Sequence, residues 1–142
     1  MLRYALMLAA SLLAATQTGS SHGLEHRVSV RDTMLAVIGP ATYTIWGVES
    51  PQTDEDWLPL EQAAITVILA GSVLMEGGSE VADRNRANDP RWRELTRDMI
   101  VAAEDALQAA RRRDLQTFVE VTNDDLYAPC EECHKAFPPV VR

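Results

Sequence analysis

The chain has 142 residues and only two cysteines, and both lie close to its C-terminal end in the segment YAPCEECHKAF, residues 127–137. Cys130 and Cys133 are three positions apart, and His134 follows directly. Residues three apart share one face of a helix, so two thiols at this spacing can add to the two vinyl groups along one edge of a porphyrin. The adjacent histidine can then bind the iron. The pattern C-x-x-C-H therefore predicts one covalent haem c, with His134 as the proximal ligand.

Two other uses of these residues stay open. A redox-active dithiol also has the pattern C-x-x-C, but it accompanies βαβ units, and this chain shows no strand-like alternation. A zinc site needs four ligands, and only Cys130, Cys133 and His134 are close in sequence, whereas His22 and His26 are near the N-terminal end. No serine, histidine and carboxylate set and no phosphate-binding loop is present, so the sequence predicts no enzyme.

The first residues have the layout of a secretory signal peptide. Arg3 precedes an apolar run over 4–15, and small or polar residues follow it. That run is shorter than the roughly 20 residues of a membrane-spanning helix, so we expect no stable membrane insertion of the mature chain. The expected division is a signal peptide over 1–21 and one domain over 22–142, exported to the periplasm, where free thiols tend to oxidise.

The charge balance restricts the partners. The formal net charge is −8, and 46% of the residues are hydrophobic, so the chain is acidic and still able to form a core. An acidic surface disfavours nucleic acid and favours partner proteins with basic docking faces.

The rest of the chain predicts helices. Four segments carry apolar residues at spacings of three and four: 28–46, 54–75, 90–113 and 115–136. Asp89 and Asp114 are expected to cap the third and fourth segments, while the second starts either at Thr53 or at Pro59. The triplet RRR at 111–113 is expected to be a solvated helix end.

Four such helices predict an all-α fold, an antiparallel up-and-down four-helix bundle with its longest loop over 77–89 and the haem near the C-terminus. Pro40 is expected to bend the first helix, and Pro129 to kink the fourth just before Cys130. A three-helix arrangement is the alternative if the first helix is broken at Pro40.

These features together resemble the class II c-type cytochromes, that is, the cytochrome c′ family and its low-spin relatives. The resemblance covers essentially all of the mature chain. It rests on the four helices, on CEECHKAF close to the C-terminus and on a first helix of the form VRDTMLAVIGPA. It implies a four-helix fold with one haem, and it allows a homodimer through the first two helices.

The resemblance also implies a distal ligand. In the low-spin branch a methionine early in the first helix is the sixth iron ligand, and Met34 stands at the matching place. In the high-spin branch an apolar residue leaves that position open to nitric oxide or carbon monoxide. An up-and-down bundle brings Met34 and His134 to the same end, but it also brings Leu74, Met75, Trp92 and Met99 there, as rival sulfur ligands or as pocket walls.

Two functions follow from these alternatives. With His134 and Met34 both on the iron, the protein is expected to be a one-electron carrier, and a methionine ligand raises the reduction potential. Without Met34 on the iron, it is a five-coordinate haem protein that traps or senses nitric oxide or carbon monoxide. Members that bind such gases often carry a basic residue four positions after the haem histidine, where this chain has Pro138.

Overall fold

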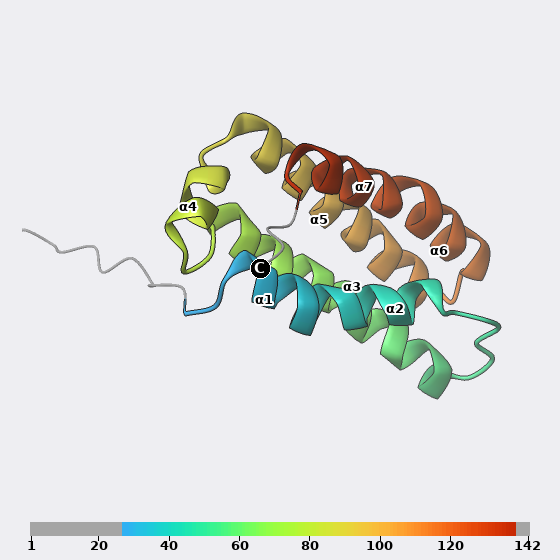
Figure 1. The fold of residues 1–142 in the computed structure, drawn as a ribbon. Helices are drawn as coiled ribbons and strands as arrows, with labels where there is room; N and C mark the ends of the chain where they lie inside the picture. The colour runs from blue at the N-terminus through green and yellow to red at the C-terminus, as the bar shows by residue number, and fades with distance from the viewer. Residues whose placement is uncertain (1–26, 139–142) are drawn as a thin grey trace, which may run out of the picture.

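The computed structural model describes residues 27–138, and every regular element within that range is a helix (Figure 1). The predicted all-α class is therefore confirmed. The predicted signal peptide over 1–21, together with His22 and His26, lies outside the described residues.

The helices form five continuous runs. Two of these runs contain a π-helical turn between α-helical parts. In chain order the elements are α1 (Val30–Thr33), η1 (Met34–Ile38) and α2 (Gly39–Trp46), then α3 (Asp54–Glu76), α4 (Val81–Ala87) and α5 (Pro90–Arg111), and finally α6 (Leu115–Val121), η2 (Thr122–Leu126) and α7 (Tyr127–Ala136).

Side-chain caps fix where the long helices begin. α3 starts after Thr53, whose hydroxyl accepts a hydrogen bond from the Asp56 N–H at 3.2 Å, while the Asp56 carboxylate accepts one from the Thr53 N–H at 2.9 Å. Pro59 therefore lies inside α3. Asp89 and Asp114 cap α5 and α6 as predicted, each accepting from a backbone N–H in the first turn, at 2.8 and 3.1 Å.

The prediction of a loop over 77–89 is wrong, because this segment contains α4. Gly77 has a φ of 84°, a left-handed conformation that favours glycine, and it turns the chain away from the end of α3. α4 then packs against both α3 and α5. Its seven residues are mostly polar, so its hydrophobic pattern is too weak to predict a helix.

α4 is also joined to the start of the first run. The buried Asp83 carboxylate accepts a hydrogen bond from the Val30 N–H at 2.9 Å, and the Ser79 N–H donates to the Val28 carbonyl at 2.9 Å. A Cβ at Gly78 would lie 2.6 Å from both the Asp83 carboxylate and the Val30 nitrogen, so only glycine fits there. This connection holds α1 beside α4.

A π-helical segment precedes each of the two prolines for which a bend or kink was predicted. Pro40 follows η1 and Pro129 follows η2, and in η1 the Gly39 N–H donates to the Met34 carbonyl, five residues back. Proline lacks an N–H, and in an α-helix its ring clashes with the carbonyl four residues earlier. A wider π-helical turn just before the proline moves that carbonyl away from the ring. Since the run over 30–46 is continuous, the condition for the three-helix alternative is not met.

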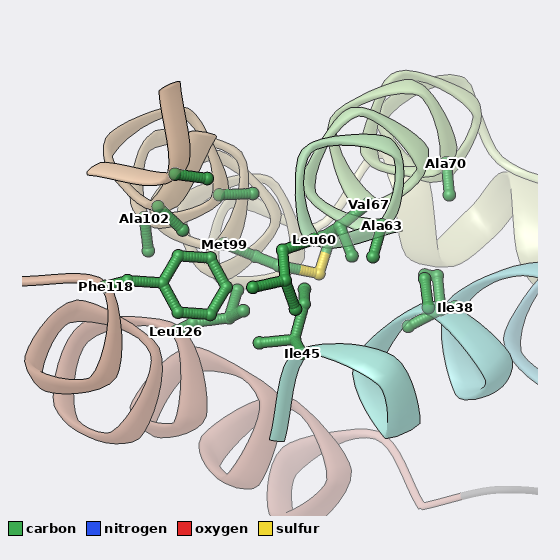
Figure 2. Packing of buried hydrophobic residues seen from close by; sticks show 14 of the residues in the cluster. Ile38, Ile45, Leu60, Ala63, Val67, Ala70, Met99, Ala102, Phe118 and Leu126 are labelled. Atoms are coloured by element: carbon green, nitrogen blue, oxygen red, sulfur yellow. The ribbon is translucent and has the colours of Figure 1, made fainter. Parts of the chain in front are cut away.

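The hydrophobic core lies between the four long runs (Figure 2). α3 and α5 pack closely because small residues line their contact: a Cβ at Gly71 would lie only 2.5 Å from the Ile100 side chain. Ile45 from α2 and Phe118 from α6 are fully buried against this pair. The side chain of Met99 points into the same core.

The triplet over 111–113 is more than a solvated helix end. Arg113 has a φ of 59°, and its guanidinium pairs with Asp54 at 2.8 Å and Glu61 at 2.5 Å. The same group lies 5.8 Å from the ring centroid of Trp57. Arg113 therefore links the end of α5 to the beginning of α3.

α3 is the one helix among the described residues that is long and apolar enough to cross a membrane, with a mean hydropathy of 1.6 over an 18-residue window. A core helix passes the same test, and 39% of that window is buried inside the protein. This is weak support for a membrane span.

Candidate functional site

The start of the first run, α4, the start of α5 and the end of α7 surround a pocket of about 580 Å³. The end of α7 and α4 lie at the same end of the molecule in Figure 1. Six residues of the pocket wall matter for its chemistry: Met34, Arg86, Trp92, Cys133, His134 and Phe137.

Three of the four predicted site residues line this pocket. Met34 comes from η1, and Cys133 and His134 come from α7. Met34 and Cys133 are half-buried, whereas His134 is exposed. Cys130 does not line the pocket; it is half-buried one turn earlier on α7, against the edge of the hydrophobic core. The fold thus brings the start of the first run to the C-x-x-C-H motif.

The rival residues are placed differently. Met99 is 5% exposed and belongs to the core cluster drawn in Figure 2, and neither it nor Met75 lines the pocket. Trp92 does line it, buried, with its indole N–H donating to the Leu74 carbonyl at 2.9 Å.

Two aromatic rings in contact with each other line the pocket. Trp92 and Phe137 meet edge to face, with ring centroids 5.2 Å apart. Phe137 directly follows α7, and its N–H donates to the Cys133 carbonyl at 2.8 Å. The aromatic wall is therefore fixed to the same turn that carries the motif.

Both thiols are held in their neutral form. Burial raises the pKa of Cys130 to about 11, and the neighbouring Cys133 adds to this shift. Burial also raises the pKa of Cys133, although Arg86 and Arg91 act against it. Redox-active C-x-x-C motifs instead lower a thiol pKa at a helix N-terminus, so the present arrangement disfavours a thioredoxin-like dithiol.

A zinc site gains no support either. In the part of the chain that the structure describes, no group of three or more histidine, cysteine, aspartate or glutamate side chains is arranged to hold a metal ion. Cys130, Cys133 and His134 therefore do not converge on one point as zinc ligands do.

A second, open groove of about 480 Å³ runs between α5 and the η2–α7 segment, and the sequence did not predict it. Its lining is mostly acidic, and among residues 27–138 the only basic residue that lines it is Arg91; the acidic residues are Asp98, Asp105, Asp124, Asp125 and Glu132. They come from helices far apart in sequence, so no local charge run indicated this groove.

Arg86 is one of the pocket residues that sequence reasoning missed. It belongs to α4, and the polar segment that contains it looked like a loop.

Comparison of the chain with known protein families, curated proteins and solved structures finds no match.

Proposed function

We propose that this chain is a one-electron carrier of the class II c-type cytochrome kind, with one haem c attached through Cys130 and Cys133. In this proposal His134 is the proximal iron ligand and Met34 the distal one. The observation that carries it is that Met34, from the first helical run, lines the same pocket as Cys133 and His134 from the last.

The residues of the pocket fit a haem. A volume of about 580 Å³ falls within the range of cofactor sites, roughly 300–1,000 Å³. The wall offers a thiol, a thioether and an imidazole beside two aromatic rings. The exposure of His134 to the pocket leaves its ring nitrogens free of competing partners within residues 27–138.

When bound, the haem supplies reversible one-electron chemistry, and the chain positions and shields it. Cys130 and Cys133 fix it to α7. His134 and Met34 would be the protein ligands of the iron, and a methionine ligand would favour a high reduction potential. Trp92 and Phe137 keep water from one side of the pocket.

The proposal includes an up-and-down four-helix bundle made of the four long runs, with α4 as an addition. Two hydrogen bonds support antiparallel neighbours. The Trp92 indole at the start of α5 donates to Leu74 near the end of α3. The Trp46 indole at the end of α2 donates to the Thr122 carbonyl at 3.1 Å, early in the last run.

We also propose that the protein works in the periplasm with basic redox partners and does not bind nucleic acid. The acidic groove is next to the motif, because Glu132 lines it. Electron exchange requires close approach to the haem, and a negative surface beside it attracts a positively charged partner.

The test is production of the chain together with the haem-attachment machinery. We expect a red protein whose haem resists extraction by acid acetone and whose ferrous spectrum is low-spin and unchanged by carbon monoxide. Colourless protein, or extractable haem, would contradict covalent attachment. Attached haem that binds carbon monoxide at once would instead favour the five-coordinate gas-binding alternative.

A further inference from the structure

Like the exposed Arg31, which also lines the pocket, Arg86 carries a charge that the fold itself does not use. It is half-buried on α4, and the structure gives its guanidinium no hydrogen bond or ion pair within residues 27–138. The nearby arginines differ: Arg84 donates to the Ser79 carbonyl at 2.6 Å, and Arg93 donates to the Met75 carbonyl at 3.3 Å.

The acidic groups around the pocket have other partners. Asp32 accepts from the Ser29 hydroxyl at 2.7 Å as part of the α1 cap, and Asp83 accepts from the Val30 N–H at 2.9 Å. Glu80, which also lines the pocket, is engaged as well. Arg86 therefore presents a positive, hydrogen-bonding group to whatever fills the pocket.

We propose that Arg86 binds a carboxylate of the pocket's occupant, which is a haem propionate if the function proposed above holds. A guanidinium matches a carboxylate with two parallel hydrogen bonds, and partial burial strengthens the pair. The propionates leave the porphyrin on the edge away from the vinyl groups. Arg86 reaches the pocket from α4, whereas the thiols come from α7, so the two edges are held by different elements.

This assignment makes α4 part of the redox site. A positive charge beside the haem favours the reduced state, so removing it lowers the reduction potential. For one half-buried charge, the equilibrium constant for reduction should fall by about tenfold. Since the haem is covalently attached through α7, its retention does not depend on Arg86.

The experiment compares the haem-loaded wild type with three variants. Arg86→Gln removes the charge, and Arg86→Lys keeps the charge without the planar fork. Arg97→Gln is the control, because Arg97 is exposed on α5 and does not line the pocket. Mass spectrometry gives the covalent haem content, resonance Raman the propionate bending band, and redox titration the midpoint potential.

We expect Arg86→Gln to shift the propionate band and lower the potential, and Arg86→Lys to shift the band while largely keeping the potential. Arg97→Gln should change neither. Haem-loaded Arg86→Gln with the wild-type band and potential would overturn the assignment, as would an equal fall of potential in Arg86→Lys. Wild type without covalent haem would instead refute the proposed function, so the two failures are distinguishable.

Discussion

The Met34 side chain is half-buried on the pocket wall, at the first residue of η1. A methionine in a helical stripe is most often a core residue, as Met99 is here. Met34 differs from Met99 because it shares its pocket with an exposed histidine. Under the proposed function, the choice between electron transfer and gas binding therefore depends on this one sulfur.

Replacement of Met34 by alanine should leave the haem attached and change the iron to a high-spin form that binds carbon monoxide, because the sixth ligand is removed. Optical spectra of the ferrous protein with and without carbon monoxide measure this. Met99→Leu is the matched control, because it alters a core methionine away from the pocket and should leave the spectrum unchanged. An unchanged spectrum in Met34→Ala would show that the distal ligand is another residue.

The buried thiols give a pH dependence to the haem-free chain. The pKa of Cys130 rises in the fold from 9.0 to about 11, so its burial contributes stability that is present below about pH 9 and lost as the pH rises through about 11. Thioether sulfurs do not titrate, so haem attachment should abolish this loss. Urea unfolding at about pH 8 and about pH 10 measures it. The double variant Cys130→Ser, Cys133→Ser should not show this pH dependence of stability. An equal loss of stability between about pH 8 and about pH 10 in the double variant would show that the thiols are not its cause.

At the residue scale, the assignment of Cys130, Cys133 and His134 to a haem rests on local spacing alone, and it stays a prediction. Met34 could not be assigned from periodicity, which fits a core residue equally well, and it required the family resemblance. Arg86 could not be found from the sequence, since its position depends on α4.

At the element scale, α4 and the start of the first run form one unit through Asp83 and Val30. This unit places α1 and η1 against the pocket, although α4 contributes little to the core. Its stability therefore bears on the position of Met34 more than on folding of the rest of the molecule.

Replacement of Gly78 by alanine should destabilise this unit by roughly 1–3 kcal/mol, because the new methyl group would overlap the Asp83 carboxylate and the Val30 nitrogen. Thermal unfolding measures the loss, and the ferrous spectrum of the haem-loaded protein reports any displacement of Met34. Ser79→Ala, which removes an exposed hydroxyl next door, should change stability by less than about 0.5 kcal/mol. Equal stability of Gly78→Ala and wild type would contradict the packing at this turn.

The long helices could be predicted because local signals agree with tertiary packing: the Thr53, Asp89 and Asp114 caps and a continuous apolar stripe. α4 could not, because a seven-residue helix is stable only through its tertiary contacts. The π-helical turns could not be predicted either. Pro40 and Pro129 indicate that a helix is interrupted, but they do not indicate that the interruption is a π-helical turn.

At the scale of the whole molecule, the net charge is −8, and several of the acidic residues lie together in the groove beside the C-x-x-C-H motif. Charge on this scale affects encounter rates rather than the fold. The groove therefore is the surface where we expect basic redox partners to approach.

Reduction by a small cationic reagent should slow as ionic strength rises, whereas reaction with an anionic reagent should accelerate, because salt screens the surface charge. Asp124→Asn should lower the rate with the cationic reagent by roughly twofold at low salt. Stopped-flow kinetics measure both effects. Glu104→Gln removes an exposed charge outside the groove and should have a smaller effect; equal effects would argue against a local docking surface.

The two π turns lie in the two runs that carry the proposed haem ligands. η1 starts at Met34, and η2 separates the core-packing α6 from the motif on α7. Each wide turn acts as a one-residue insertion, and one residue rotates an α-helix by about 100°. The direction of the ligands is thereby set independently of the stripe that packs the core. Deleting one residue from either turn should preserve a well-packed helix while rotating its ligands out of register with the pocket, so the site can be lost by a change that the core tolerates.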